Sequence, residues 1–525
     1  MQETKMNIAV QSVKKPTMEQ QRAVDKAMTL KSSFKLIAFA GTGKTTTLIL
    51  ISNALKTQGK RGLYLAFNKK MAQEASLKFN EASLDNVDCS TFHALALKNV
   101  PAWLKAKINK PQLFPKDIAE KFNLEPYEVV YHGKNRALSS LVLGLTVLNT
   151  LKYYCMSDDK NINGDHAFEA IKEQAHISRN EQFIAKITSI AKTIWDDICD
   201  ESGEYGISHD YYLKWWVNQR PTLNYDFYML DESQDADALI LSVLKRQKAK
   251  TIYVGDSHQQ IYSFRCAHNL LQKLECEALY LQQSFRFGPK VARLANLILN
   301  QILDEDRQLK GLPGKRTNTE LLYAFHNEFP IKDLNAVICR TNAKAFEYYF
   351  KYAEYFDGAK KIRMEIEGDR SVEIFKGICN LRSGKDADCA ELKAFRTFGD
   401  LVEHVEIHKE FDGSSTELST YLELSKKYSF AVIEYALENS RSQNNGDFSD
   451  CLVISTAHKA KGLEFNNVLI AEGFNYKIVD ERLSIDKEEA RLIYVAVTRA
   501  KSNLFYDGIS DLVRYLEIRA SKNNA

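Results

Sequence analysis

The sequence predicts an α/β protein with two parallel, doubly wound sheets, each interrupted by a mainly helical insertion. Short apolar runs of the kind that form buried parallel strands recur in both halves of the 525-residue chain. Segments with helical spacing, such as residues 46–57 and 69–79, lie between these runs. Repeated strand–helix units are typical of open parallel sheets covered by helices. Two stretches with few strand-like runs break this alternation and predict the insertions.

The expected strands and insertions divide the chain into four parts. The runs that are short and apolar enough to be buried strands are residues 63–67, 227–230, 251–254, 336–339, 452–454 and 468–470. We expect the first α/β domain at residues 1–100 and 205–280, its helical insertion at 101–204, the second α/β domain at 281–381 and 448–525, and its shorter helical insertion at 382–447.

The charge, the cysteines and the apolar segments of the chain exclude some classes of protein but do not identify a binding partner. The 71 basic and 68 acidic residues give a net charge of +3, which is too small to indicate nucleic-acid binding by itself. The nine cysteines include no Cys-x-x-Cys pair, which argues against zinc ribbons and iron–sulfur sites and suits a reducing compartment. The most apolar segment, residues 138–151, is shorter than the roughly 18 residues of a membrane span and predicts a buried helix. With no secretory signal apparent at residues 1–10, we expect a cytoplasmic protein, nucleoid-associated if bacterial, with no membrane partner.

An apolar strand at residues 36–40 runs directly into a glycine loop and the start of a helix. This pattern is typical of a phosphate-binding loop, in which backbone N–H groups and the helix N-terminus surround an oxyanion. Lys44 can reach a β- or γ-phosphate, and Thr45 can hold Mg²⁺. The pattern departs at Ala38, where a strict loop has Gly; a plain glycine turn beside a chance Lys-Thr pair is the alternative. The loop residues expected to bind ATP are Ala40, Gly41, Thr42, Gly43, Lys44, Thr45 and Thr46.

An acidic pair follows the expected strand at residues 227–230, at the position where open α/β sheets bind ligands. Asp231 is the natural carboxylate for Mg²⁺, and Glu232 is the natural general base for the attacking water. Gln234 can sense the γ-phosphate. An exposed acidic turn is the alternative, but such a turn does not need a hydrophobic strand directly before it.

Polar amides and aromatic residues follow the next expected strand, at residues 251–254. Gln259 or Gln260 can contact the γ-phosphate from this position. Tyr262, Phe264 and Arg265 combine aromatic faces with a cation, a set suited to stacking on bases. The alternative for Tyr262 and Phe264 is that they are core aromatics in a short strand.

The ordered series of motifs resembles the UvrD/Rep-like branch of the superfamily 1 DNA helicases, and within it the helicase portion of the F-box DNA helicases. The resemblance implies two RecA-like P-loop domains. The stretch His-Asp-Tyr-Tyr-Leu-Lys-Trp at residues 209–215 favours the F-box branch. The second insertion is shorter than in the larger family members, so we do not expect the regulatory swivelling ascribed to it there. The motifs that carry the resemblance are at residues 17–24, 38–45, 66–70, 91–94, 231–235, 255–267, 281–286, 455–465 and 489–500.

The resemblance implies further contacts to ATP. Gln20 is similar to the family's adenine-reading glutamine, and Phe285, in place of the usual tyrosine, keeps a face for stacking on adenine. Glu464 would accept a hydrogen bond from the ribose hydroxyl. Arg286 and Arg499 resemble arginine fingers, which stabilise the charge that develops on the γ-phosphate. The residues expected to act in catalysis are Lys44, Glu232, Gln260, Arg286 and Arg499.

The same resemblance, together with the aromatic set, implies contacts to DNA. Lys459 and Lys461 are either solvated loop charges or contacts to DNA phosphate. The residues expected to bind DNA are Phe67, Asn68, Thr91, His93, Tyr262, Phe264, Arg265 and His458.

These expectations combine into one function with two rivals. We expect an ATP- and Mg²⁺-dependent helicase or translocase that binds single-stranded DNA and single/double-strand junctions, in DNA repair, recombination or replication. The resemblance implies 3′→5′ movement; the residues themselves do not fix direction. The rivals are a translocase that strips proteins from DNA without unwinding, and an ATPase switch subunit of a defence or signalling complex. An RNA helicase is disfavoured because the motifs match DNA-acting relatives.

Overall fold

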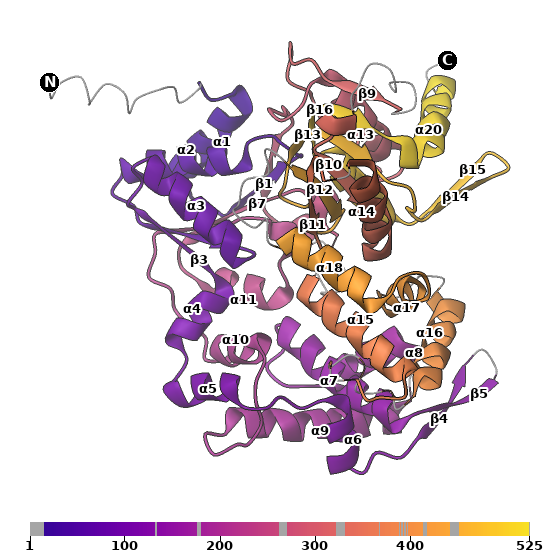
Figure 1. Cartoon of the computed structure of the whole chain (residues 1–525). Helices are drawn as coiled ribbons and strands as arrows, with labels where there is room; N and C mark the ends of the chain where they lie inside the picture. Colours follow the sequence, from indigo (N-terminus) through magenta and orange to yellow (C-terminus); the bar gives the residue numbers. More distant parts are fainter. Residues whose placement is uncertain are drawn as a thin grey trace, which may run out of the picture. The chain divides into compact units, whose positions relative to one another are not determined.

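The chain forms two compact units, and Figure 1 shows their elements along the sequence. Unit 1 comprises Met1–Gln112, Lys152–Ile162 and Ile194–Gln283, and unit 2 comprises Leu113–Leu151, Asn163–Thr193 and Ser284–Ala525. The computed structural model describes residues 15–131, 134–175, 180–261, 270–321, 331–356, 358–366, 368–387, 389, 392, 395, 397–412, 417–441 and 451–523.

Unit 1 is built on a six-stranded parallel sheet with the order β3-β2-β6-β7-β1-β8 in the part of the chain that the structure describes. Ile37 of β1 lies beside Gly255 of β7, and Leu65 of β2 lies beside Leu230 of β6. The loops that follow these strands therefore leave the same edge of the sheet. The strands are β1 (Phe34–Ala38), β2 (Gly62–Ala66), β3 (Val87–Thr91), β6 (Phe227–Leu230), β7 (Lys250–Gly255) and β8 (Glu277–Leu281).

The helices of unit 1 cover this sheet with an apolar core. Phe34 and Leu36 of β1 pack with Leu48 and Ile51 of α2, and all four side chains are buried. The first helix starts with a capping box, in which Thr17 and Gln20 satisfy each other's backbone N–H groups. The helices are α1 (Met18–Thr29), α2 (Lys44–Lys56), α3 (Lys69–Glu81), α4 (Phe92–Asn99), α5 (Ala102–Ala106), α10 (His209–Asn218), α11 (Ala238–Arg246) and α12 (Leu270–Lys273), with the 3-10 turns η1 (Lys107–Asn109), η2 (Ser233–Asp235) and η3 (Ser257–Gln259).

The segment between α5 and α10 is mainly helical, as expected, but it also contains a β-hairpin that the sequence analysis did not predict. The buried helix expected at residues 138–151 is α7, whose Leu143, Val147 and Leu151 form a buried stripe at helical spacing. Leu138 instead ends the second strand of the hairpin. The elements are α6 (Pro115–Lys121), β4 (Tyr127–Tyr131), β5 (Lys134–Leu138), α7 (Ser140–Met156), α8 (Gly164–Ala175) and α9 (Glu181–Cys199).

Unit 2 contains a second parallel sheet, with the order β11-β12-β10-β13-β16-β9 among the described residues. A two-stranded antiparallel hairpin, β14 with β15, stands apart from this sheet. Two parallel sheets with many helices confirm the expected α/β class, while the domain boundaries stay predictions. The strands are β9 (Asn318–Glu320), β10 (Ala336–Cys339), β11 (Lys361–Glu365), β12 (Cys451–Thr456), β13 (Phe465–Ile470), β14 (Tyr476–Val479), β15 (Arg482–Ile485) and β16 (Ala500–Phe505).

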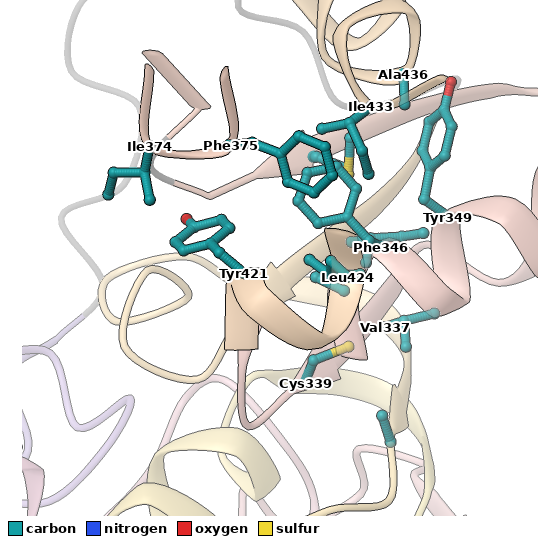
Figure 2. Close-up of a cluster of buried hydrophobic side chains, with 14 of the residues drawn as sticks. Val337, Cys339, Phe346, Tyr349, Ile374, Phe375, Tyr421, Leu424, Ile433 and Ala436 are labelled. Carbon is teal, nitrogen blue, oxygen red and sulfur yellow. The ribbon is translucent and has the colours of Figure 1, made fainter. Parts of the chain in front are cut away.

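The helices α15, α17 and α18 share one hydrophobic core with helix α14 and the sheet of unit 2. Figure 2 shows Phe346 and Tyr349 of α14 together with Phe375 of α15 and Ile433 of α18. One buried cluster thus joins these helices to the sheet. The helices are α13 (Pro289–Gln301), α14 (Asn342–Phe356), α15 (Gly368–Arg382), α16 (Phe398–Asp412), α17 (Glu417–Lys427), α18 (Phe430–Arg441), α19 (Lys487–Val497) and α20 (Ser510–Asn523), with the turns η6 (Ile331–Asp333) and η7 (Asp507–Ile509).

The expected strands are confirmed as β2, β6, β7, β10, β12 and β13, with ends that differ by a few residues. Among the helices that the structure describes, none combines the length and the apolar character needed to cross a bilayer.

Candidate functional site

The glycine loop after β1 has the backbone of a phosphate-binding loop. Gly41 and Gly43 have φ angles of 73° and 82°, a conformation that glycine adopts without the penalty of a side chain. Between them, the buried Thr42 donates a 2.7 Å hydrogen bond from its hydroxyl to the carbonyl of Phe39. Helix α2 then begins at Lys44. Within the expected ATP set, Ala40 is buried, Thr45 is half-buried and Thr46 is exposed.

Gln20 lies next to this loop, as the expected adenine contact requires. Its side-chain amide donates a 3.3 Å hydrogen bond to the hydroxyl of Thr47, which in turn donates to the carbonyl of Gly43 at 2.9 Å. The structure therefore brings Gln20 and the phosphate loop together, although 23 positions separate Gln20 from Gly43 in the sequence.

The acidic pair after β6 meets the phosphate loop directly. Nζ of Lys44 lies 2.5 Å from Oε1 of Glu232, and both side chains are mostly buried. Burial alone lowers the pKa of Lys44, but the nearby carboxylates, led by Glu232, outweigh burial and raise that pKa. Glu232 itself has a φ of 50°, which is uncommon for a residue with a side chain. Such backbone strain often accompanies a functional role.

Asp231 is held by two hydrogen bonds beneath this ion pair. Its Oδ2 accepts from the Tyr64 hydroxyl at 2.7 Å, and its Oδ1 accepts from the Glu232 backbone N–H at 2.9 Å. Only 5% of Asp231 is exposed. Burial raises the pKa of this carboxyl group, and the Glu232 carboxylate adds to the rise, while Lys44 and Tyr64 oppose it. A cation at this position would favour the ionised form.

The chemistry of this edge fits Mg²⁺ bound together with a nucleotide. In a phosphate-loop site, one carboxylate and one hydroxyl hold the ion while the phosphates and water complete its oxygen shell. Asp231 and Thr45 provide these two groups at the ends of β6 and the glycine loop. Among the described residues, no cluster of three or more His, Cys, Asp or Glu side chains could hold a metal ion alone.

The loop after β7 closes the polar network around Glu232. Gln234 is fully buried; its amide donates to Oε2 of Glu232, and its Oε1 accepts from the Asp256 backbone N–H at 3.1 Å. Glycine is needed at position 255, because a Cβ there would lie 2.2 Å from Oε1 of Gln234. Gln260, the expected γ-phosphate contact, is buried in the same loop.

Four of the expected DNA residues lie at the end of β3 or just after β2 and β3, which are neighbours in the sheet. Ala66 pairs with Thr91, so the residues after these strands leave the same edge as the phosphate loop. Asn68 caps helix α3 and Thr91 caps helix α4 through side-chain oxygens. Phe67 is half-buried, and the His93 side chain is 40% exposed. Tyr262, Phe264 and Arg265 lie outside the described residues.

In unit 2, Arg286 is already engaged by oxygen atoms. Its Nε donates a 2.8 Å hydrogen bond to Oε2 of Glu464, and its Nη1 donates to the carbonyl of Thr498 at 2.9 Å. Burial raises the pKa of Glu464, but Arg286 and Lys501 reverse this effect and keep the carboxyl pKa below its usual value. Phe285 beside them is 37% exposed, so its ring has a free face.

Arg499 lies deeper than the expected role as an arginine finger suggests. Only 1% of it is exposed. Its guanidinium donates to the carbonyls of Val495 and Leu463, at 2.8 and 3.1 Å, and to the hydroxyl of Thr498 at 3.0 Å. In this conformation, the side chain ties the end of α19 to the loop before β13. His458 is half-buried in the turn after β12.

Comparison with known proteins decides the family. Residues 146–510 match the model of the UvrD-like helicase C-terminal domain, which is more than half of the chain. The chain belongs to the UvrD-like helicase family. Residues 20–265 also match an AAA domain model, and this range contains the glycine loop and the acidic pair.

This UvrD-like chain is similar to named DNA helicases. It is 30% identical to F-box DNA helicase 1 of Gallus gallus, over 93% of this chain and 49% of the relative. It is 28% identical to F-box DNA helicase protein 1 of Schizosaccharomyces pombe, over 93% of this chain and 57% of the relative. The chain thus spans about half the length of the curated relatives it matches. A solved arterivirus nonstructural protein 10 helicase with DNA covers 95% of this chain and 65% of that one at 10% identity, with a TM-score of 0.32.

Two residues of this UvrD-like site were missed by the sequence analysis. Tyr64 holds Asp231, and Asp256 accepts from the His258 backbone N–H and from the Gln259 side chain, at 3.0 and 2.7 Å. The available signal for Tyr64 was a phenol in an otherwise aliphatic buried strand, because a buried tyrosine hydroxyl needs a partner. Asp256 is acidic and directly follows a buried strand, as Asp231 does.

Proposed function

We propose that this chain is an ATP-driven motor that moves on single-stranded DNA and unwinds duplex DNA from a single-strand junction. The observation that carries the proposal is the ion pair between Lys44 of the phosphate loop and Glu232 of the acidic motif. It places a phosphate-binding cation beside a candidate general base at one sheet edge. The similarity to F-box DNA helicases supports DNA as the nucleic acid.

The residues of unit 1 suggest how hydrolysis proceeds. Lys44 exchanges its ion pair with Glu232 for an oxygen of the β- or γ-phosphate. Glu232, released from Lys44, then orients the attacking water and accepts its proton as the water attacks the γ-phosphorus. The bond from that phosphorus to the bridging oxygen breaks, and ADP leaves with the bond's electron pair. The buried amide of Gln234 keeps Glu232 in place through this exchange. Mg²⁺ held by Asp231 and Thr45 would neutralise charge on the phosphate oxygens.

We propose the remaining ATP contacts from the resemblance to the helicase family. Gln20 reads adenine, Phe285 stacks on the base and Glu464 accepts from the ribose. Gln260 contacts the γ-phosphate. Arg286 and Arg499 stabilise the charge of the transition state, as arginine fingers do in related reactions. Because both guanidinium groups are engaged by protein oxygens, nucleotide binding must exchange these contacts for phosphate.

The DNA strand would follow the residues after β2 and β3. Phe67 offers a face for base stacking, and Asn68, Thr91 and His93 offer polar groups to the backbone. Tyr262, Phe264, Arg265 and His458 complete the proposed DNA set. Cycles of ATP binding and hydrolysis would then hand bases along the aromatic faces, in the 3′→5′ direction that the resemblance implies. Binding should weaken with salt, because phosphate contacts release counterions.

Steady-state ATP hydrolysis with and without single-stranded DNA tests the proposal. We expect DNA to stimulate hydrolysis, and Glu232→Gln to lower kcat about 100-fold or more while ATP still binds. Glu201→Gln, at an exposed position of unit 1, is the matched control and should hydrolyse ATP normally. A rate of ATP hydrolysis that does not change when DNA is added would exclude the DNA motor and favour the partner-controlled ATPase switch.

Further substrates separate the remaining alternatives. An RNA of equal length should stimulate hydrolysis less than DNA does. Duplexes with a 3′ or a 5′ single-stranded tail test direction, and 3′→5′ movement requires unwinding of the 3′-tailed duplex. Displacement of a protein bound to single-stranded DNA, without any unwinding, would identify a protein-stripping translocase.

A further inference from the structure

Helix α10 carries the sequence stretch that favours the F-box branch, and the proposed function gives it no role. In the structure, α10 packs against α4, the helix whose first turn contains the proposed DNA residue His93. Two side chains of α10 meet this histidine. Asp210 lies at its Nε2, and the Tyr212 ring packs edge-on against it with 6.3 Å between ring centroids. The neighbourhood of His93 is therefore built largely by α10.

The contact between His93 and Asp210 engages one of the two ring nitrogens. Nε2 of His93 lies 3.1 Å from Oδ1 of Asp210. An ionised carboxylate can only accept a hydrogen bond, so Nε2 must carry a proton and donate it. Nδ1 is then the ring atom left for another partner. Because the His93 side chain is 40% exposed, Nδ1 can meet a ligand from solution.

A buried lysine holds α10 and so fixes Asp210. Lys214 is fully buried one turn along the helix, and its Nζ donates to the carbonyls of Ser157 and Asp159, at 2.8 and 2.7 Å. The same ammonium lies 4.1 Å from the centroid of the Tyr154 ring. These contacts tie α10 to the end of α7, so Asp210 presents its carboxylate from a firmly held element.

We propose that Asp210 is a positioning residue of the DNA site, which holds the His93 imidazole through Nε2 and presents Nδ1 to a DNA phosphate. The proposal rests on the proposed DNA role of His93 and deepens it. A phosphate oxygen only accepts hydrogen bonds, so Nδ1 must also carry a proton to donate to it. The ring then binds as an imidazolium between two anions, the Asp210 carboxylate and the phosphate. The carboxylate thus orients the ring and balances its charge, as partners of functional histidines commonly do.

A simple charge effect predicts the opposite result, which makes the proposal sharply testable. Asp210 is an anion close to the proposed path of a polyanion. If it acted only by repulsion, both Asp210→Ala and Asp210→Asn would bind single-stranded DNA more tightly. If it positions His93, Asp210→Ala should bind DNA about tenfold more weakly, since a hydrogen bond to a charged group is lost. Asp210→Asn should recover most of the affinity, because its amide oxygen can still accept from Nε2.

The experiment measures the affinity of the full chain for a fluorescent oligo-dT at several salt concentrations. His93→Ala should weaken binding about tenfold and reduce the salt slope by about 0.7, the value for one phosphate contact on a single strand. The double variant His93→Ala/Asp210→Ala should equal His93→Ala, because the carboxylate acts only through the imidazole. The DNA concentration for half-maximal ATPase should rise in each weakened variant.

Controls separate the possible failures. Asp165→Ala removes an acidic residue from the first turn of another helix, α8, and should leave DNA affinity unchanged. Additive losses in the double variant, or tighter binding by Asp210→Ala, would overturn the positioning role while leaving the motor proposal intact. Unchanged affinity in His93→Ala would remove its premise. Failure of the unmodified chain to bind DNA would overturn the proposed function itself. If Asp210→Ala does not fold, the test uses the DNA affinities of Asp210→Asn and of the double variant His93→Ala/Asp210→Asn instead. Tighter binding by Asp210→Asn would overturn the positioning role.

Discussion

The hydroxyl of Tyr64 donates a 2.7 Å hydrogen bond to Oδ2 of Asp231 from the neighbouring strand of the same sheet. Burial raises the pKa of Tyr64 well above its usual value, and the Asp231 carboxylate raises it further. The phenol therefore stays protonated and remains a donor at any physiological pH. A fixed donor orients the carboxylate that we assign to Mg²⁺.

Tyr64→Phe should weaken the response to Mg²⁺ with little change in fold. We expect the Mg²⁺ concentration for half-maximal ATP hydrolysis to rise about tenfold, because outer-shell hydrogen bonds commonly contribute this much to metal affinity. The Mg²⁺ dependence of the Tm increase caused by ADP should shift in parallel. Tyr228→Phe is the matched control, since its hydroxyl is also buried but donates to the Leu223 carbonyl at 2.6 Å. An equal shift in both variants would contradict the assignment.

Gly255→Ala should impair hydrolysis through Gln234. The new Cβ would lie 2.2 Å from Oε1 of Gln234, so this buried amide would have to move away from Glu232. We expect kcat to fall about tenfold or more, with the KM for ATP little changed, because the general base is disturbed and the phosphate loop is not. The control is Gly399→Ala, whose Cβ would make an ordinary 3.5 Å contact with Thr397. Normal kcat in Gly255→Ala would argue against the role of Gln234.

Asp237→Asn should stabilise the protein at neutral pH and not at acidic pH. Burial raises the pKa of Asp237 to about 6, well above the usual value of an aspartate, although its carboxylate caps helix α11 by accepting from the Ile240 N–H at 2.8 Å. As pH rises from about 4 to 6, the unfolded chain ionises first, so stability falls through this window and stays lower above it. The free energy of unfolding is therefore lower above this window than below it by roughly 2–3 kcal/mol.

The test for Asp237 is the Tm of the variants as a function of pH. Asparagine is also a good N-cap, so Asp237→Asn removes the charge and keeps the cap. Its Tm should exceed that of the unmodified chain at pH 7.5 and match it near pH 4. Asp237→Ala removes the cap as well and should lose about 1 kcal/mol relative to Asp237→Asn at both pH values. A Tm gain for Asp237→Asn that does not depend on pH would contradict the burial of a charge.

Phe375→Ala should destabilise the sheet of unit 2 together with the helices that share its core. Phe375 is fully buried, and its ring stacks on Phe430 of α18 with centroids 6.4 Å apart. We expect the free energy of unfolding to fall by about 3–5 kcal/mol. Hydrogen exchange should accelerate in α17, α18 and β12 alike. The control is Tyr355→Ala in α14. Because Tyr355 is 57% exposed, this change should alter the free energy of unfolding by less than about 1 kcal/mol. Faster exchange confined to the helices would mean that they unfold independently.

The parts of the site that the sequence could predict are those encoded locally. Gly41, Gly43 and Lys44 lie next to each other, and Asp231 directly follows an apolar strand, so strand–loop patterns identify both halves. Tyr64 is different, because its partner Asp231 is 167 positions away and is reached only when β2 and β6 become neighbours in the sheet. The pairing of strands cannot be read from the residues of either strand.

Strands were missed in the sequence analysis for different reasons. Strand β3 reads Val-Asp-Cys-Ser-Thr, with polar residues between two buried ends, so its strand character comes from pairing with β2. The hairpin of β4 and β5 lies within a stretch of helical composition. Strand β4 contains the strand-forming run Val-Val-Tyr, a signal that could have predicted it, whereas β5 reads Lys-Asn-Arg-Ala-Leu and has no such run. The burial of Arg499 was also unpredictable, because arginine is seldom buried unless it is paired.

In the ion pair between Lys44 and Glu232, the carboxylate competes with any anionic ligand for the lysine ammonium group. Any anion that approaches Lys44 must offer more than the carboxylate 2.5 Å away already does. A ligand with several negative charges and its own cation can meet this requirement, whereas a nucleoside monophosphate or a single inorganic anion has little to offer. We therefore expect the loop to favour a nucleoside triphosphate with its cation over less highly charged nucleotides, whatever their base or sugar.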